Sequence, residues 1–170
     1  MTIANPHSAL PKPDSPYARD GYFNGPERVS RLIYHAQLWM GTPWCANSDA
    51  RGRGVSCHNL PRAVYIEAGA LSPEFPRVQG DPNGTKHKKE SIIEPWIDSR
   101  PELFRLPYDA RPKPGDLLGL RIYHCLDHLG VCLAGVWFVH VLMHKHVDCD
   151  DLSVPPWRQR ILGIWRVKPS

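Results

Sequence analysis

The sequence lacks the patterns that mark several common classes of protein. Its cysteines number 5 and include no Cys-x-x-Cys pair, which argues against a disulfide framework and against a zinc ribbon. No apolar run approaches the length of a membrane-spanning helix, so we expect no membrane insertion. Residues 1–20 contain no apolar signal segment, and we therefore expect synthesis in a cytoplasm without a signal peptide.

A dense stripe of Lys and Arg with interleaved aromatic residues is also missing, although the chain is mildly basic. The formal net charge is +4 and the pI is near 8.9. We interpret most of these charges as a solvated surface and expect no nucleic-acid partner. With 170 residues, 42% of them hydrophobic, and no internal repeat, the chain fits one domain with a sizeable core.

Proline, in contrast, is abundant, with 18 residues in the chain. The prolines within residues 1–24 disfavour regular structure, so we predict an N-terminal arm over 1–24 and a single domain over 25–170. Residues 72–112 are rich in proline and charge, which indicates loops and turns. Within that stretch, the apolar residues around Ile93 predict one short helix, which Pro95 keeps short.

Hydrophobic spacing predicts two longer helices in the first half of the chain. The first begins near Pro26, since proline is favoured in the first turn, and ends at Gly41. The second ends near Gly69. Its apolar residues fall on one face: Cys57, Leu60, Val64, Ala68 and Leu71. Because the ring of Pro61 would crowd a helix that begins at Cys57, we expect this helix to begin a residue or two later or to kink.

The second half of the chain has the patterns of strands. Apolar or alternating residues predict strands over 117–122, 128–134, 137–142 and 161–167. Helices followed by antiparallel strands make the predicted fold class α+β, with N-terminal helices packed on a small antiparallel sheet.

Cys57 is the strongest candidate for chemistry, because it falls at the start of a predicted helix. Unpaired N–H groups and the positive end of the helix dipole favour a thiolate there, and the thiolate is the nucleophilic form. The backbone N–H of Cys57 would be an oxyanion donor. The competing interpretation, an inert cysteine in an apolar core, fits Cys45, Cys125 and Cys132 better.

Two histidines on neighbouring predicted strands can complete the site. His128 and His140 lie symmetrically about Ala134, so a three-residue turn centred there would place them opposite each other on one face. A two-residue turn at Ala134 and Gly135 would put them on opposite faces instead. In the first arrangement His128 would take the thiol proton, and His140 would orient the His128 ring.

A metal site is the main alternative, because potential ligands are dense near the C-terminal end. They are His124, His128, His140, His144, His146 and Cys149. Zinc requires about four nitrogen or sulfur ligands that converge tetrahedrally. His140 and His144 would share a face only on a helix, whereas this region has the pattern of strand and loop. We therefore expect no metal and no other cofactor.

The segments that carry these residues also resemble a known family. They are GTPW, GVSCHNLPRAVYIEAG, KPGDLLGL, HLGVCLAGVWFVHV and PPWRQRILGIWRV, within about residues 26–168. In this order they resemble the NlpC/P60 cysteine peptidases, and look most like the short branch found in bacteriophage tails and gene-transfer particles. The resemblance implies a papain-like α+β fold and hydrolysis of peptide bonds in peptidoglycan stem peptides. It places Cys57, His128 and His140 on the nucleophile, the base and the third polar residue.

The resemblance also implies substrate-binding or oxyanion roles for Trp44, Ser56, His58 and Asn59. The family usually has an acidic residue before the cysteine and Ser-Gly after it, where this chain has Ser56, His58 and Asn59. Trp44 stands where a tyrosine commonly helps to shape the oxyanion site. These differences from the family have two interpretations: the protein has an altered specificity, or it is a structural remnant with little activity.

The function expected from this resemblance is a cell-wall cysteine endopeptidase on a phage tail tip that opens peptidoglycan during genome delivery. Its partners would be peptidoglycan peptides and tail hub or tip proteins. It would be made in a bacterial cytoplasm and act from the virion at the host wall. Two alternatives stay open: a catalytically weak or inactive structural tail component of the same fold, and a secreted amidase effector.

Overall fold

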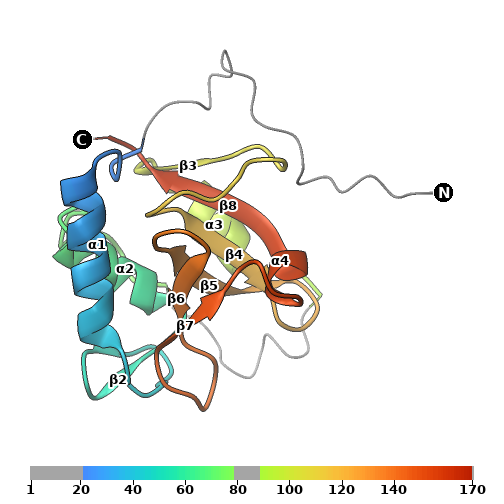
Figure 1. Ribbon diagram of the computed structural model, residues 1–170. Helices are drawn as coiled ribbons and strands as arrows, with labels where there is room; N and C mark the ends of the chain where they lie inside the picture. Colours follow the sequence, from blue (N-terminus) through green and yellow to red (C-terminus); the bar gives the residue numbers. More distant parts are fainter. Residues whose placement is uncertain (1–20, 79–88, 170) are drawn as a thin grey trace.

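The computed structural model describes residues 21–78 and 89–169, in which helices pack against an antiparallel sheet (Figure 1). The helices are α1 (Pro26–Trp39), α2 (Asn59–Glu67), α3 (Ile93–Asp98) and α4 (Trp157–Arg160). The six-stranded sheet contains, in spatial order, β3 (Leu103–Arg105), β8 (Ile161–Val167), β4 (Leu117–Arg121), β5 (Leu126–Cys132), β6 (Trp137–His140) and β7 (Asp148–Asp151). A separate two-stranded sheet pairs β1 (Asp49–Ala50) with β2 (Gly54–Val55). The α+β prediction is confirmed.

The core lies between the helices and one face of the sheet. α1 and α2 contact each other, and α2 also packs on β5, in the centre of Figure 1. Leu32 of α1, Leu60 and Val64 of α2 and Leu129 of β5 are all buried in one hydrophobic cluster. Helical spacing in the sequence predicts these helix positions as core, and the structure confirms them.

The predicted N-terminal arm falls mostly outside the described residues, which begin at residue 21. At its described end, Tyr22 and Phe23 are buried in the core. The N–H of Tyr22 donates to the Val167 carbonyl at 2.9 Å, and Nη1 of Arg28 donates to the Tyr22 carbonyl at 2.9 Å. Residues 21–24 therefore pack as part of the folded domain.

A buried ion pair connects the start of β4 to β8. Nε and Nη2 of Arg166 donate to the two carboxylate oxygens of Asp116 at 2.7 and 2.8 Å. The same carboxylate accepts the Lys113 N–H at 2.7 Å, so the turn before β4 is held by the pair as well. Bidentate geometry of this kind fixes both side chains in one orientation.

The turn between β5 and β6 is shifted by one residue from its predicted position. The N–H of Leu133 donates to the Trp137 carbonyl at 2.8 Å, so the three-residue turn is centred on Gly135 rather than on Ala134. Gly135 has a φ of 65°, a conformation that glycine adopts without a steric penalty. Of the two turns considered from the sequence, the structure has the three-residue one, with its centre displaced by one residue.

This shift changes how the two candidate histidines meet. His140 pairs with Gly130, so the prediction that His140 lies directly opposite His128 is wrong. Moving the centre of a turn by one residue moves each partner by two, and residues two apart on a strand share a face. His128 and His140 are therefore diagonal neighbours on the same face, close enough for their rings to touch.

The sequence does not predict the two edge strands, β3 and β7. β3 has three residues and lies in the proline-rich stretch, and β7 reads Asp-Cys-Asp-Asp, with no apolar alternation. Among the residues that the structure describes, each pairs on one side only, β3 with β8 and β7 with β6. Short or charged edge strands are common in natural sheets, and they carry the weakest pattern in a sequence.

Candidate active site

The chain turns toward α2 at Ser56, which places Cys57 just before the first turn of the helix. The Ser56 carbonyl accepts hydrogen bonds from the N–H groups of Asn59 (3.1 Å) and Leu60 (3.0 Å), and Ser56 Oγ accepts a third from Asn59 N–H (3.3 Å). The first helical N–H donors are thus Asn59 and Leu60, which precede Pro61, a residue that has no N–H to donate. Cys57 lies at the N-terminal end of α2, and α2 itself begins at Asn59, as the position of Pro61 predicts.

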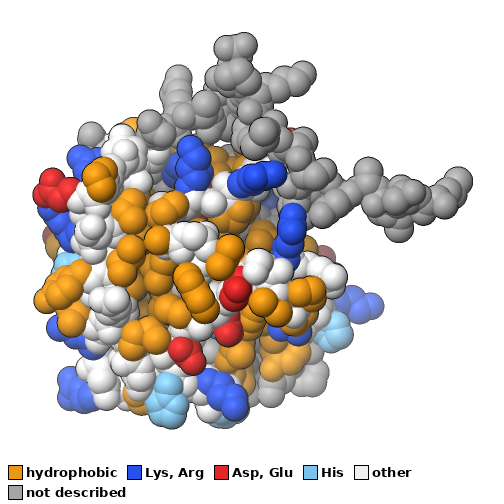
Figure 2. Space-filling model, in the orientation of Figure 1, with side chains coloured by type: hydrophobic (Ala, Val, Ile, Leu, Met, Phe, Trp, Pro, Cys, Tyr) orange, Lys and Arg blue, Asp and Glu red, His pale blue; other side chains and the backbone are white. Residues whose placement is uncertain are grey.

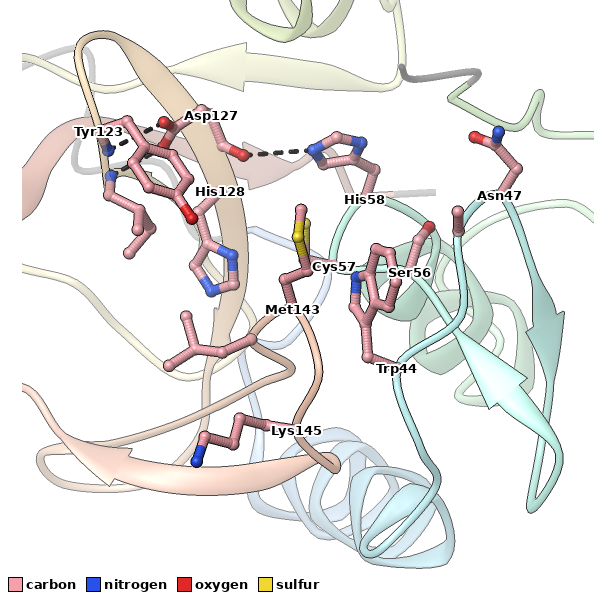
Figure 3. A pocket seen from close by; sticks show the side chains of 13 residues that line it. Trp44, Asn47, Ser56, Cys57, His58, Tyr123, Asp127, His128, Met143 and Lys145 are labelled. Carbon is pink, nitrogen blue, oxygen red and sulfur yellow. Dashed lines mark hydrogen bonds between the residues drawn. The ribbon is translucent and has the colours of Figure 1, made fainter. Parts of the chain in front are cut away.

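Cys57 and His128 line one pocket beside the N-terminal end of α2 (Figure 3). The rest of the lining is Trp44, Ala46, Asn47, Ser56, His58, Ile122, Tyr123, Asp127, Leu142, Met143 and Lys145. Figure 3 shows the Cys57 thiol and the His128 ring pointing into the space between α2 and β5. A partly apolar pocket with a few convergent polar groups is the usual form of a small-ligand or peptide site.

Behind the pocket, three side chains form a hydrogen-bonded series that leads away from Cys57. Nε2 of His128 lies 2.9 Å from Nδ1 of His140. Nε2 of His140 lies 2.9 Å from Oδ2 of Asp150, on β7. His140 does not line the pocket, so it can act on a substrate only through His128.

Aromatic side chains fix the plane of the His140 ring. Phe138, two residues earlier on β6, stacks on it with centroids 4.6 Å apart and an interplanar angle of 28°. Trp157 of α4 meets it edge to face at 4.7 Å and 79°. The ring is 3% exposed, so rotation out of this arrangement would disturb a packed cluster.

Both imidazoles are held in the neutral form. Burial lowers the pKa of His128 well below its usual value, and the neighbouring His140 lowers it further. Burial also lowers the pKa of His140, although the hydrogen bond and the charge of Asp150 act in the opposite direction. A neutral imidazole can accept a proton, which is the state that a general base requires.

Burial raises the pKa of the Cys57 thiol from 9.0 to about 12. Backbone hydrogen bonds from Leu129, Cys57 and His58 favour the thiolate, and the charge of Asp127 disfavours it. The backbone at the helix start thus favours the thiolate, as expected from the sequence, but burial outweighs this effect and raises the pKa of the thiol. The site rests as a neutral thiol beside a neutral imidazole.

Asp127 has a structural role beside His128. Its carboxylate accepts the N–H groups of Ile122 (2.7 Å) and Tyr123 (2.9 Å), which holds the β4–β5 turn against β5. Its carbonyl oxygen lies 3.3 Å from Nε2 of His58. Both carboxylate oxygens are thus engaged, and the strand carrying His128 is fixed at its start.

Three of the four predicted substrate-binding residues line the pocket, and the fourth does not. Trp44, Ser56 and His58 contribute to its wall, whereas Asn59 is fully buried beneath it. The side-chain amide of Asn59 has no hydrogen-bond partner among the described residues. Of the four residues, Trp44, Ser56 and His58 are thus accessible from the pocket, and Asn59 is not.

Asp150 belongs to this site, but no pattern in the sequence indicates it. It lies on an edge strand without an apolar pattern, ten residues beyond His140. Within residues 21–78 and 89–169, no group of three His, Cys, Asp or Glu side chains is arranged to hold a metal ion. In the same ranges, no helix has the length and apolar character needed to cross a bilayer.

No protein-family model matches the sequence, and a comparison with curated proteins finds no match. Solved structures do share the fold. A protein similar to lipoprotein, of the NLP/P60 family, from Staphylococcus aureus superposes with a TM-score of 0.58 at 21% identity, over 86% of this chain and 43% of that one. The peptidoglycan hydrolase RipB from Mycobacterium tuberculosis superposes with a TM-score of 0.52 at 17% sequence identity, over 91% of this chain and 71% of RipB.

The NlpC/p60 domain of the peptidoglycan hydrolase SagA gives a TM-score of 0.51 at 16% identity, over 81% of this chain and 97% of that domain. The chain thus spans nearly all of an isolated NlpC/p60 domain, and less than half of the staphylococcal protein. These neighbours are NlpC/P60 proteins, and at such identities they establish the fold. The predicted papain-like α+β fold is confirmed.

Proposed function

We propose that this protein is a cysteine peptidase or amidase that hydrolyses peptide bonds in peptidoglycan stem peptides. The observation that carries the proposal is the meeting of Cys57 and His128 in one pocket, with His140 hydrogen-bonded behind His128. A nucleophile, a base and a group that orients the base are the three parts of a thiol hydrolase. SagA and RipB, which share the fold, are peptidoglycan hydrolases, and this supports the substrate class.

The reaction starts from the neutral pair. Because Nε2 of His128 is hydrogen-bonded to His140, Nδ1 is the nitrogen left to take the thiol proton. As the proton leaves, the Cys57 sulfur attacks the amide carbonyl carbon, and the C=O electron pair moves onto oxygen. Collapse of this oxyanion breaks the C–N bond, and the departing amine takes the proton from His128, which leaves a thioester on Cys57.

Water then resolves the thioester. It gives a proton to Nδ1 of His128 while its oxygen attacks the thioester carbonyl, and collapse of the second oxyanion breaks the C–S bond. The thiolate recovers its proton from His128, and a carboxylic acid leaves. No hydrogen bond joins the Cys57 thiol to His128 among the described residues, and such contacts often tighten only when a substrate is bound.

Two N–H donors serve the oxyanion in this proposal. The backbone N–H of Cys57 lies in the turn that leads into α2, at the end of the helix where N–H groups have no intrahelical acceptor. Figure 3 shows the indole nitrogen of Trp44 on the edge of the ring that faces Cys57. The backbone of Trp44 is fixed, since its N–H donates to the Lys145 carbonyl at 2.8 Å. Trp44 thus offers an N–H where the resembling family commonly has a tyrosine hydroxyl.

We also propose that the protein works at a bacteriophage tail tip, where it would open the host wall locally during genome delivery. The support is the sequence resemblance to the short tail-associated branch of the family. In this proposal the chain is made in the bacterial cytoplasm and binds tail hub proteins in the virion. Antibody labelling of purified particles should mark the tip of the tail, and particles that lack the protein would contradict this location.

A structural tail component of the same fold is the second candidate, and exposed apolar side chains favour it. Figure 2 shows hydrophobic side chains spread over the face formed by α1 and the neighbouring strands. Leu38 and Met40 near the end of α1 are each 40% exposed, and Trp137 of β6 is 52% exposed. Large apolar side chains exposed to solvent can mark a protein–protein contact.

Hydrolysis of purified muropeptides separates the two candidates. The wild-type protein and its Cys57→Ala variant are incubated with them, and the products are identified by mass spectrometry. Cys45→Ala is the matched control, because Cys45 is exposed and does not line the pocket. New stem-peptide fragments from wild type and Cys45→Ala, and none from Cys57→Ala, support the peptidase. Folded protein that yields no fragments in any form supports the structural role.

A further inference from the structure

The hydrogen-bonded series from His128 to Asp150 has a direction, and that direction decides whether His128 can act as a base. Each neutral imidazole carries one N–H and one lone pair. The bond between Nε2 of His128 and Nδ1 of His140 can therefore run either way. If His128 donates, its Nδ1 holds a lone pair toward the pocket. If His140 donates, Nδ1 of His128 carries a hydrogen and cannot take the thiol proton.

The ring contacts do not select one direction. Phe138 and Trp157 hold the plane of the His140 ring, but an apolar face does not distinguish between its two tautomers. Asp150 does distinguish between them, because a carboxylate can only accept. With Oδ2 of Asp150 at 2.9 Å, Nε2 of His140 must carry the hydrogen, and Nδ1 of His140 is left as an acceptor. His128 must then donate from Nε2.

We infer that Asp150 is a positioning residue that fixes both imidazole tautomers and so leaves the lone pair of His128 Nδ1 facing Cys57. The arrangement has four members: Cys57, His128, His140 and Asp150. Only the effect of Asp150 on the reaction rests on the proposed function. The tautomers themselves are properties of the substrate-free protein.

Asp148 provides a matched control on the same strand. It pairs with His140 in the register of β6 and β7, and its charge also acts on that imidazole. Its Oδ1, however, accepts the N–H of its neighbour Cys149 at 2.8 Å. Asp148→Asn thus removes a nearby negative charge and leaves the hydrogen bond to His140 in place. Arg160 on α4 and His58 are the other charged or titratable groups that act on His128.

The test is nitrogen-15 NMR of histidine-labelled, substrate-free protein, which reports which ring nitrogen carries the hydrogen. Signals are assigned with His128→Gln and His140→Gln. We expect Nε2–H at both residues in wild type and in Asp148→Asn. In Asp150→Ala we expect a mixture of the two tautomers at both residues, because the group that separates their energies is gone. Wild-type tautomers in Asp150→Ala, or Nδ1–H at His128 in wild type, would overturn the role of Asp150.

Turnover of muropeptides adds a second readout. Asp150→Ala removes the preference for the competent tautomer, and it also removes the hydrogen bond and the charge that favour the charged form of the imidazole series when His128 takes the thiol proton. We therefore expect kcat of Asp150→Ala to fall by about 10²-fold and that of Asp148→Asn to change by less than about twofold. A fall in kcat with unchanged tautomers would mean a merely structural effect and would also overturn the role. If the tautomers shift as expected and no form hydrolyses muropeptides, Asp150 keeps this role and the proposed function is the part that fails.

Discussion

The resting state of Cys57 is a prediction that a simple reagent can test. With its pKa raised from 9.0 to about 12, the thiolate fraction at pH 7 falls by about 10³-fold relative to an ordinary cysteine. A more basic thiolate is also a better nucleophile, and a Brønsted slope of about 0.4–0.5 recovers roughly 16- to 30-fold of that loss. We therefore expect Cys57 to react with iodoacetamide about 30- to 60-fold more slowly than a free thiol.

The assay follows alkylation of the Cys57 peptide by mass spectrometry between pH 6 and pH 10. The reference is a synthetic peptide of residues 54–60, which has the same neighbours and no fold. We expect the rate at Cys57 to rise about tenfold for each pH unit across the whole range, without a plateau. A rate that is already level between pH 6 and pH 8 would show a preformed thiolate–imidazolium pair, and the neutral-pair mechanism would be refuted.

Three further predictions concern the oxyanion, the specificity and the fold. Trp44→Phe keeps an aromatic ring and removes the indole N–H, so kcat on muropeptides should fall by about 10²-fold; an unchanged kcat would exclude this donor. The pocket is lined by the positive charge of Lys145 and by the negative charge of Asp127. Lys145→Glu makes the net charge negative, so cleavage of peptides with a free amine relative to N-acetylated peptides should rise roughly fivefold, from about 1 kcal/mol of charge attraction, and an unchanged ratio would exclude this effect. Arg166→Met leaves the Asp116 carboxylate buried without its partner, and urea unfolding should show a loss of about 3–5 kcal/mol. The half-exposed Arg105→Met should lose less than about 1 kcal/mol, and equal losses would contradict the importance of the buried pair.

Much of the fold could be predicted from the sequence, because the core elements carry strong apolar patterns. The spacing of Leu32, Leu60 and Val64 places both long helices, and the apolar runs place the central strands. Pro61 even predicts where α2 begins. The edge strands β3 and β7 could not be predicted, since charged or very short segments have no periodicity to detect.

Part of the candidate site could also be predicted from the sequence, and part could not. Cys57 and His128 could be found because a helix start and a strand face are visible in the pattern of residues. The turn centred on Gly135, the burial of Asn59 and the partner of His140 depend on how strands register and pack, and one sequence does not define these. The protonation state of Cys57 could not be predicted from the sequence either, because it depends mainly on how deeply the thiol is buried.

The most direct measurement is the mass of the protein during turnover. Muropeptides are mixed with the wild-type protein, the reaction is stopped with acid within the first turnovers, and the digested protein is searched for an acyl group. We predict a thioester on Cys57 alone, which hydroxylamine removes, and none in Cys57→Ala. Product formation with no acyl group on Cys57, or equal product from Cys57→Ala, would contradict nucleophilic catalysis by this residue.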